Sequence, residues 1–204
     1  MINHLRKALV VVFLASFVGL ASAEDEWATS YQFELQGNYS KAIQTLSPIL
    51  KQEPDHEFAR LRIAWLRYLN RDFNASARDY KRALEINGDS LEAQLGITLP
   101  LLAQARWREA EQAAQAVLAI APWNYYAHVR MLVAAEGQAK WDRLADRARA
   151  LSARYPTDAT ALVYLARAEA RRGNTQEARR AYAAGLERVP DHIEAGTFLV
   201  SGSR

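Results

Sequence analysis

The chain has 204 residues, of which 50% are hydrophobic and 24% charged, a composition that is typical of a globular protein and argues against intrinsic disorder. It contains no cysteine, which excludes disulfides, thiolate metal sites and a cysteine nucleophile. The 26 basic and 23 acidic residues nearly balance, and the sequence has no basic block of the kind that binds phosphate backbones, so nucleic acid is not expected as a partner.

The N-terminal residues 1–23 have the pattern of a secretory signal peptide. Arg6 and Lys7 precede an uncharged apolar run, and the small residues 21–23 supply an A-x-A cleavage site. The run is shorter than the ~20 apolar residues of a membrane-spanning helix, so we expect cleavage before Glu24 rather than a retained anchor. The mature chain would then carry 24 basic residues (26 minus 2) and 23 acidic ones. The location expected from this pattern is the bacterial periplasm.

The rest of the sequence repeats with a period of 34 residues. Residues that stop helices recur at this spacing: Pro54, Gly88, Pro122, Pro156 and Pro190. Large aromatic residues form a second series: Tyr39, Phe73, Trp107 and Trp141. Small or apolar residues form a third: Ala42, Ser76, Ala110, Leu144 and Ala178. Several series with one period predict tandem copies of a single structural unit.

Each unit has the pattern of two amphipathic helices. Between residues 57 and 70, apolar side chains fall on one helical face at i, i+3, i+4 and i+7: Leu61, Ala64, Trp65 and Tyr68. A helix stopper and then an aspartate, Asp55 or Asp89, close the unit, and this aspartate is placed to cap the next helix. We expect first helices near residues 24–36, 57–70, 91–104, 125–138 and 159–172. We expect second helices near residues 40–53, 74–87, 108–121, 142–155 and 176–189.

Two segments depart from this regular pattern. Pro100 falls inside the first helix of the third unit, where we expect it to bend the helix, either as a tolerated kink or as a change in the curvature of the stack. Gly96, one turn earlier, is expected to add flexibility. After the fifth unit, residues 193–204 suit one short capping helix and a frayed tail.

The repeat resembles that of the tetratricopeptide repeat (TPR) family, whose motif is a Trp, a Leu-Gly, a Tyr, then Ala-x-x-x-Phe and a closing Pro. The second half of the motif is matched well, for example by Ala178, Tyr182 and Pro190. The first half is degenerate, because the Trp position holds Glu26, Arg60, Gln94, His128 and Leu162. The resemblance implies an all-α, right-handed superhelical solenoid of five helix pairs. Their bounds are about 23–56, 57–90, 91–124, 125–158 and 159–192.

No group of residues predicts catalysis. The sequence has no H-E-x-x-H motif, no G-x-S-x-G elbow, no phosphate-binding glycine loop and no dinucleotide fingerprint. His56 and His192 both occur in the sequence PDH at the same repeat position, which identifies them as linker residues beside a helix start. We therefore expect no enzyme activity, no metal and no cofactor.

The resemblance implies that the first helix of every pair lines a concave surface, where ligands of the family usually bind. The residues that this assigns to the groove are Trp27, Tyr31, Phe58, Leu61, Trp65, Tyr68, Tyr126, Arg167 and Arg171. Aromatic rings at the N-terminal end suit an extended peptide or a partner helix, and arginines at the other end suit a carboxylate. The alternative is that some aromatics form the core between helices and that the arginines are merely solvated.

The function expected from these features is that of an exported scaffold that binds another protein or a peptide segment in the cell envelope or in a secretion complex. Two alternatives remain: recognition of a polymer such as an exopolysaccharide, and service as the non-catalytic subunit of an envelope enzyme. Contact with a membrane is expected only through a partner or through an uncleaved signal segment.

Overall fold

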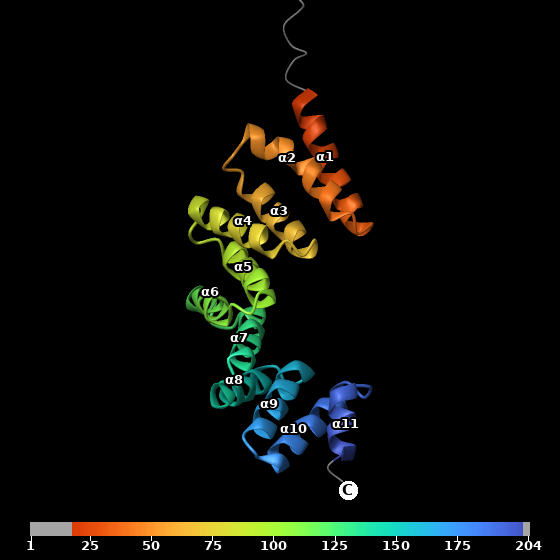
Figure 1. Ribbon diagram of the computed structural model, residues 1–204, viewed down its shortest axis with the longest axis vertical. Helices are drawn as coiled ribbons and strands as arrows, with labels where there is room; N and C mark the ends of the chain where they lie inside the picture. Colours follow the sequence, from red (N-terminus) through yellow and green to blue (C-terminus); the bar gives the residue numbers. More distant parts are fainter. Residues whose placement is uncertain (1–17, 202–204) are drawn as a thin grey trace, which may run out of the picture.

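The computed structural model describes residues 18–201, with their side chains from residue 26 onward. Within these residues the chain forms eleven α-helices and no strand (Figure 1). The helices are α1 (Val18–Leu35), α2 (Tyr39–Gln52), α3 (Glu57–Leu69), α4 (Phe73–Ile86), α5 (Leu91–Ala103), α6 (Trp107–Ile120), α7 (Tyr125–Gly137), α8 (Trp141–Arg154), α9 (Ala159–Arg171), α10 (Thr175–Arg188) and α11 (Ile193–Ser201). None of the helices in this described part is long and apolar enough to cross a bilayer.

The expected all-α solenoid of helix pairs is confirmed. From α2 to α10, every helix begins and ends within one residue of its expected bounds. The exception is α1, which begins at Val18 and not near residue 24. The signal segment expected at residues 1–23 lies outside the described residues, apart from its last six positions, which form the start of α1.

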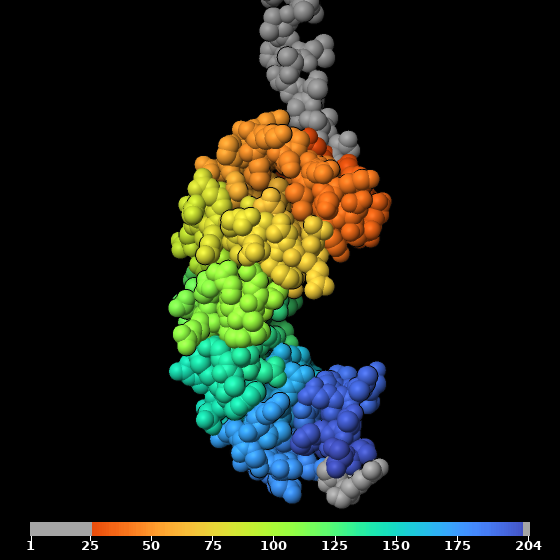
Figure 2. Space-filling model, viewed as in Figure 1, coloured from red at the N-terminus to blue at the C-terminus, as the bar shows by residue number. Residues whose placement is uncertain are grey.

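The helices stack into a curved body. Each helix contacts the next one along the chain, and α3 also contacts α5, α5 contacts α7, and α7 contacts α9. These extra contacts place the odd-numbered helices on the inner side of the curve, because the inner side of a bent stack is the shorter one. Figure 2 shows the resulting hollow side, with the N-terminal helices at one end and α11 at the other. The concave surface is therefore built by the first helix of each pair.

Two series of buried residues hold each pair together. The series of small or apolar residues on the second helices is completely buried: Ala42, Ser76, Ala110, Leu144 and Ala178. The first helices supply an equally buried series with the same period: Ser30, Ala64, Thr98, Leu132 and Ala166. The Ser30 hydroxyl donates to the Ala42 carbonyl at 3.1 Å, and the Ser76 hydroxyl donates to the Ala64 carbonyl at 2.8 Å. Small side chains allow this close approach, and the bonds satisfy buried hydroxyls.

The capping of the first helices differs from the sequence expectation. Asp55 and Asp89 are not the caps of α3 and α5, because the residue after each of them takes that role. His56 Nδ1 accepts from the Ala59 N–H at 3.3 Å, and the Ser90 hydroxyl accepts from the third helical N–H of α5 at the same distance. Asn124 and Asp158 cap α7 and α9 from the same repeat position. Each side chain satisfies an N–H that lacks a partner within its helix.

The turn inside each pair uses one left-handed residue. The backbone φ is positive at the five equivalent positions Gly37, Arg71, Ala105, Ala139 and Gly173. The next residue then donates back across the turn, as the Asn38 N–H does to the Phe33 carbonyl at 2.8 Å. This is the Schellman closure of a helix, which is least costly with glycine, and three of the five turns make it without glycine.

The third pair contains Pro100 and Gly96. Pro100 is buried within α5, which runs past it to Ala103 without interruption. A Cβ atom at Gly96 would lie 2.3 Å from the Tyr80 ring, so this glycine is required by the close approach of the ring to α5. The expectation that Gly96 serves flexibility is thus replaced by a packing role.

Candidate partner-binding surface

Aromatic rings of α1 and α3 gather where these two helices meet. The Trp27 and Phe58 rings lie with their centroids 5.0 Å apart. Phe58 is 48% exposed and Tyr31 is 44% exposed, whereas Trp27 packs partly against the core beside α2. Together with Trp65 and Tyr68 these residues form a surface that we call the aromatic wall.

Polar groups fix the position of the wall. The Arg62 guanidinium lies 3.8 Å from the centroid of the Tyr31 ring and forms an ion pair with Glu34. The Trp65 Nε1–H donates to Glu34 Oε1 at 2.8 Å. Burial alone would raise the pKa of Glu34, but the hydrogen bonds from Arg62 and Trp65 hold that pKa below its usual value. Glu34 therefore stays ionised and joins α1 to α3.

The stripe predicted on α3 divides between core and surface. Leu61 is 5% exposed and belongs to a core cluster with Ala64 and Tyr80, so its assignment to the groove is corrected. Trp65 and Tyr68 are both partly exposed, with ring centroids 5.7 Å apart, and Tyr68 also lies 5.8 Å from the Phe73 ring. These two aromatics belong to the wall and to the packing beneath it.

Tyr126 lies on α7 and does not join the wall. It is 61% exposed, and the neighbouring ring is Tyr125, whose centroid is 5.6 Å away. Trp123, in the preceding turn, is 56% exposed and lies below the Arg154 guanidinium at 5.4 Å. Trp123 lies outside the first helices and so is not among the groove residues assigned from the repeat pattern.

The two predicted arginines have different surroundings. Arg167 donates to both oxygens of Glu194, at 2.8 and 2.6 Å, and its Nη1 lies 3.4 Å from Glu136. The bonds to Glu194 raise the pKa of Arg167 further above its ordinary value. Arg167 therefore ties α9 to α11 and α7 and is occupied by carboxylates of the chain itself. Arg171 is exposed, and its guanidinium lies 5.6 Å from the centroid of the Trp141 ring.

Comparison with known proteins agrees with this geometry. Residues 159–201 match a model of the tetratricopeptide repeat family. No protein in the curated set matches the chain. A MamA structure from Desulfovibrio magneticus RS-1 superposes with a TM-score of 0.77 at 14% identity, over 84% of this chain and 97% of that one. YrrB, a TPR protein, gives a TM-score of 0.72 at 12% identity, over 88% of this chain and 95% of that one.

The chain folds as a tetratricopeptide-repeat solenoid. A TPR protein from Parabacteroides merdae gives a TM-score of 0.78 at 14% identity, over 89% of this chain and 72% of that chain. At these identities the likeness concerns the fold. The repeat match covers α9, α10 and α11, so α11 takes the place of the first helix of a further TPR unit.

The TPR fold also explains the degenerate Trp position. Three polar side chains at this position reach back six residues to the carbonyl of the preceding turn. Arg60 donates to the Pro54 carbonyl at 2.7 Å, and Gln94 donates to the Gly88 carbonyl at 3.0 Å. His128 Nε2 lies 2.9 Å from the Pro122 carbonyl. These bonds secure the turn between units.

The described residues contain no group of three or more His, Asp or Glu side chains that could hold a metal ion. TPR proteins are generally non-catalytic scaffolds, and their fold is consistent with binding other proteins. Arg62 is the residue of the wall region that could not be predicted from the sequence, because an arginine on a helix is usually expected to be exposed to solvent. Its 8% exposure is explained by its position between Tyr31 and Glu34.

Proposed function

We propose that the chain is an exported scaffold whose aromatic wall binds a segment of another protein. The observation that carries this proposal is the exposure of Tyr31 and Phe58, at 44% and 48%, on α1 and α3, two of the first helices that build the concave surface. Phe58 lies beside the Trp27 ring, at 5.0 Å between centroids. Large exposed aromatic side chains are typical of interaction surfaces, since they supply contact area at low entropic cost.

Two further features support a peptide or protein ligand. Arg62 and Glu34 hold the rings of Tyr31 and Trp65 in place, so the wall loses little side-chain freedom when a partner binds. Among proteins of similar fold, YrrB is described as having an unusual peptide-binding site. A concave TPR surface with rigid aromatic side chains suits an extended segment or a helix with apolar anchors.

The test is capture of a partner from envelope extract by the mature chain, with the double variant Tyr31→Ala, Phe58→Ala. We expect the wild type to retain one stoichiometric protein and the double variant to lose it, with an unchanged thermal midpoint. The matched control is Ile120→Ala, which removes a 51% exposed apolar side chain from the outer helix α6. If the double variant captures the partner as well as the wild type does, the aromatic wall is not the binding surface. Retention of the wild type by a polysaccharide resin, with no protein partner, would favour polymer recognition.

Export forms the second part of the proposal and is supported by the pattern of residues 1–23. Intact-mass analysis of the protein from the producing cell should give a chain that begins at Glu24. If the measured mass includes residues 1–23, the signal segment is retained, and the proposal changes to a scaffold that is tethered at its N-terminus. The same measurement on a variant with Ala21 and Ala23 replaced by leucine should show the uncleaved chain, because the peptidase requires small residues there.

A further inference from the structure

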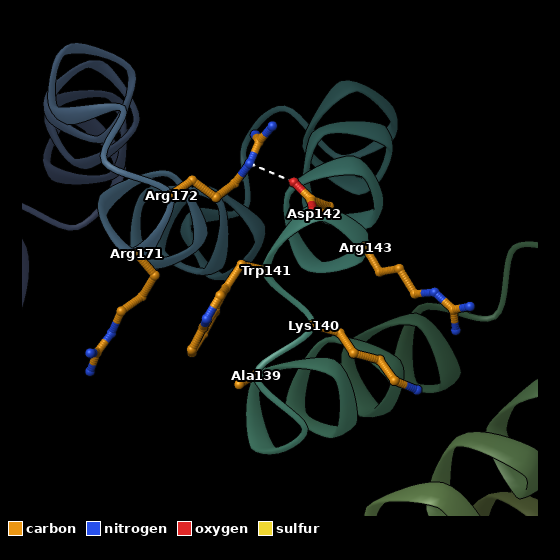
Figure 3. A pocket seen from close by; sticks show the side chains of 7 residues that line it. All are labelled: Ala139, Lys140, Trp141, Asp142, Arg143, Arg171 and Arg172. Carbon is orange, nitrogen blue, oxygen red and sulfur yellow. Dashed lines mark ion pairs between the residues drawn. The ribbon is translucent and has the colours of Figure 1, made fainter.

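A second surface lies in the C-terminal half of the stack, away from the aromatic wall. The turn between α7 and α8 and the end of α9 line an open hollow of about 540 Å³, a volume within the ~300–1,000 Å³ of ligand pockets (Figure 3). The side chains that matter here are Lys140, Trp141, Asp142, Arg143, Arg171 and Arg172. Four of these six are basic, and we call this surface the basic hollow.

Carboxylates of the chain neutralise only part of this charge. Lys140 Nζ lies 3.1 Å from one Glu111 oxygen, and Arg143 Nη1 lies 3.7 Å from the other, so one carboxylate serves two cations. Arg172 Nε lies 2.8 Å from Asp142. Arg172 Nη1 also lies 3.0 Å from Glu169, which pairs with Arg149 as well, and Arg149 pairs in turn with Asp146. Four carboxylates (Glu111, Asp142, Asp146 and Glu169) therefore face four cations (Lys140, Arg143, Arg149 and Arg172), so the surplus positive charge of the surface is that of Arg171.

Arg171 adds a cation that has no carboxylate partner among the described residues. Its guanidinium lies 5.6 Å from the centroid of the Trp141 ring, and Figure 3 shows the two side chains extending side by side from α9 and α8. An arginine beside an indole face is held by the cation–π attraction while the N–H groups at its edge stay available. This is the arrangement that receives a carboxylate through two parallel hydrogen bonds.

The shape of the hollow identifies the class of ligand. In Figure 3, Arg171 extends on one side of Trp141, and Lys140 and Arg143 extend on the other side. Cations divided in this way suit an extended chain that carries several carboxylates better than one small anion. The exposed part of the Trp141 ring offers an apolar surface between them.

We propose that the basic hollow binds an acidic segment of a partner protein, with one carboxylate held by Arg171 and an apolar side chain lying against Trp141. The inference rests on the proposed function only in that the ligand belongs to another protein. It uses none of the residues of the aromatic wall, so the two surfaces can be tested separately.

The test is to titrate the mature chain with a short synthetic peptide that alternates glutamate and leucine. Binding is monitored by NMR through the indole N–H resonance of Trp141 and the Nε–H resonance of Arg171. We expect both resonances to shift, and binding to weaken as salt concentration rises. Arg171→Gln should weaken binding at least about tenfold, the loss that follows removal of a charge-assisted hydrogen bond. Arg78→Gln is the matched control, since Arg78 is an exposed arginine on the distant helix α4.

Further ligands and variants distinguish an acidic peptide from other anions. The peptide with glutamine in place of glutamate should not shift the Trp141 resonance, and inorganic phosphate or a single-stranded oligonucleotide should bind more weakly than the acidic peptide. The proposal is overturned if the acidic peptide leaves the Trp141 resonance unmoved, if Arg171→Gln binds it like the control, or if phosphate or the oligonucleotide binds as tightly. The Tyr31→Ala, Phe58→Ala variant should bind the acidic peptide unchanged, so failure of the wall proposal is recognised independently.

Discussion

The indole Nε1–H of Trp65 donates a 2.8 Å hydrogen bond to Glu34 Oε1 and so joins the second helix pair to the first on the inner side of the solenoid. Sequence periodicity left Trp65 open to two interpretations, a groove residue or a core residue. Trp65 has features of both, because its indole is held by Glu34 and its side chain is still partly exposed. The same carboxylate holds Arg62, so three side chains depend on one anchor.

Trp65→Phe therefore tests the hydrogen bond to Glu34 while an aromatic ring stays in the same position. The phenyl ring keeps most of the apolar contact but cannot donate, so we expect a loss of about 1–2 kcal/mol in the free energy of unfolding, measured by urea denaturation. Glu34→Ala should cost more, because it removes the acceptor of this bond and also the ion pair of Arg62. In a double-mutant cycle the two losses should add only in part, because both variants remove the Trp65–Glu34 bond. Additive losses would show that the bond does not stabilise the protein.

The left-handed turns allow a stabilising change. Ala105 and Ala139 have φ values of 56° and 53°, a conformation that costs a residue with a side chain roughly 1–2 kcal/mol. Glycine removes that cost but adds about 0.4–1 kcal/mol of unfolded-state entropy. Ala105→Gly and Ala139→Gly should each raise the free energy of unfolding by about 0.5–1 kcal/mol, measured by thermal and urea denaturation.

The equivalent turn in the fifth pair supplies the reciprocal control. Gly173 has a φ of 82° and no atom within 4 Å of a built Cβ, so Gly173→Ala adds backbone strain without a clash. It should destabilise by about as much as the other substitutions stabilise. A loss of stability in Ala139→Gly would contradict the assignment of strain to these turns.

Gly96 and Gly88 should respond differently to alanine. A Cβ at Gly96 would meet the Tyr80 ring at 2.3 Å, and Tyr80 is 3% exposed and cannot move outward freely. Gly96→Ala should destabilise by about 1–3 kcal/mol through overpacking. At Gly88 the nearest atom to a built Cβ is the Leu84 carbonyl oxygen at 3.8 Å, an ordinary contact, so Gly88→Ala should be nearly neutral. Equal effects of the two changes on the urea midpoint would refute the packing role of Gly96.

The sequence was sufficient to predict the fold because every unit repeats the same apolar spacing and the same stopper. A period of 34 residues places Ala42 and Ser76 at equivalent packing positions, and both are completely buried. Such series depend on local geometry, which is the same in each unit. The bounds of α2 to α10 were therefore predicted to within one residue.

The site was harder to predict because it depends on which polar groups meet across units. Arg167 and Arg171 lie one turn apart on α9 and read alike in the sequence. Only the folded chain shows that Glu194, 27 residues further on, occupies Arg167, and that Arg171 faces a ring. Burial divided the α3 stripe in a similar way, since Leu61 faces the core cluster formed with Tyr80.

Acid should weaken the attachment of α11. Glu194 accepts hydrogen bonds from Arg167 on α9 and from the Tyr182 hydroxyl on α10, at 2.6 Å for the latter, and His192 lies near it on the same segment. The bonds from Arg167 lower the pKa of Glu194, and partial burial opposes them with a smaller effect. The folded state therefore binds fewer protons here than the unfolded state does, and the stabilisation is complete only above the ordinary glutamate pKa of 4.5.

As the pH falls below 4.5 and through the lower pKa of the folded state, this stabilisation should be lost. Glu34 and Glu111 also have lowered pKa values and act in the same direction, whereas burial raises the pKa of Asp79, which acts in the opposite one. The contribution of Glu194 is therefore the difference between wild type and Glu194→Gln. That variant should lose about 1 kcal/mol at neutral pH, after allowance for solvent screening of a partly exposed pair, and the difference should vanish in acid.

Amide hydrogen exchange resolves this change along the chain. Protection of α11 should fall in Glu194→Gln at neutral pH, and in the wild type only after acidification, because α11 is held mainly by its contacts with α10 and by the bond to Arg167. Glu177→Gln is the matched control: Glu177 is an exposed glutamate on α10 whose ion pair with Arg180 is 3.8 Å long. If α11 in Glu194→Gln keeps wild-type protection at neutral pH, Arg167 does not hold the terminal helix through Glu194, and the arginine becomes available again as a ligand for partner carboxylates.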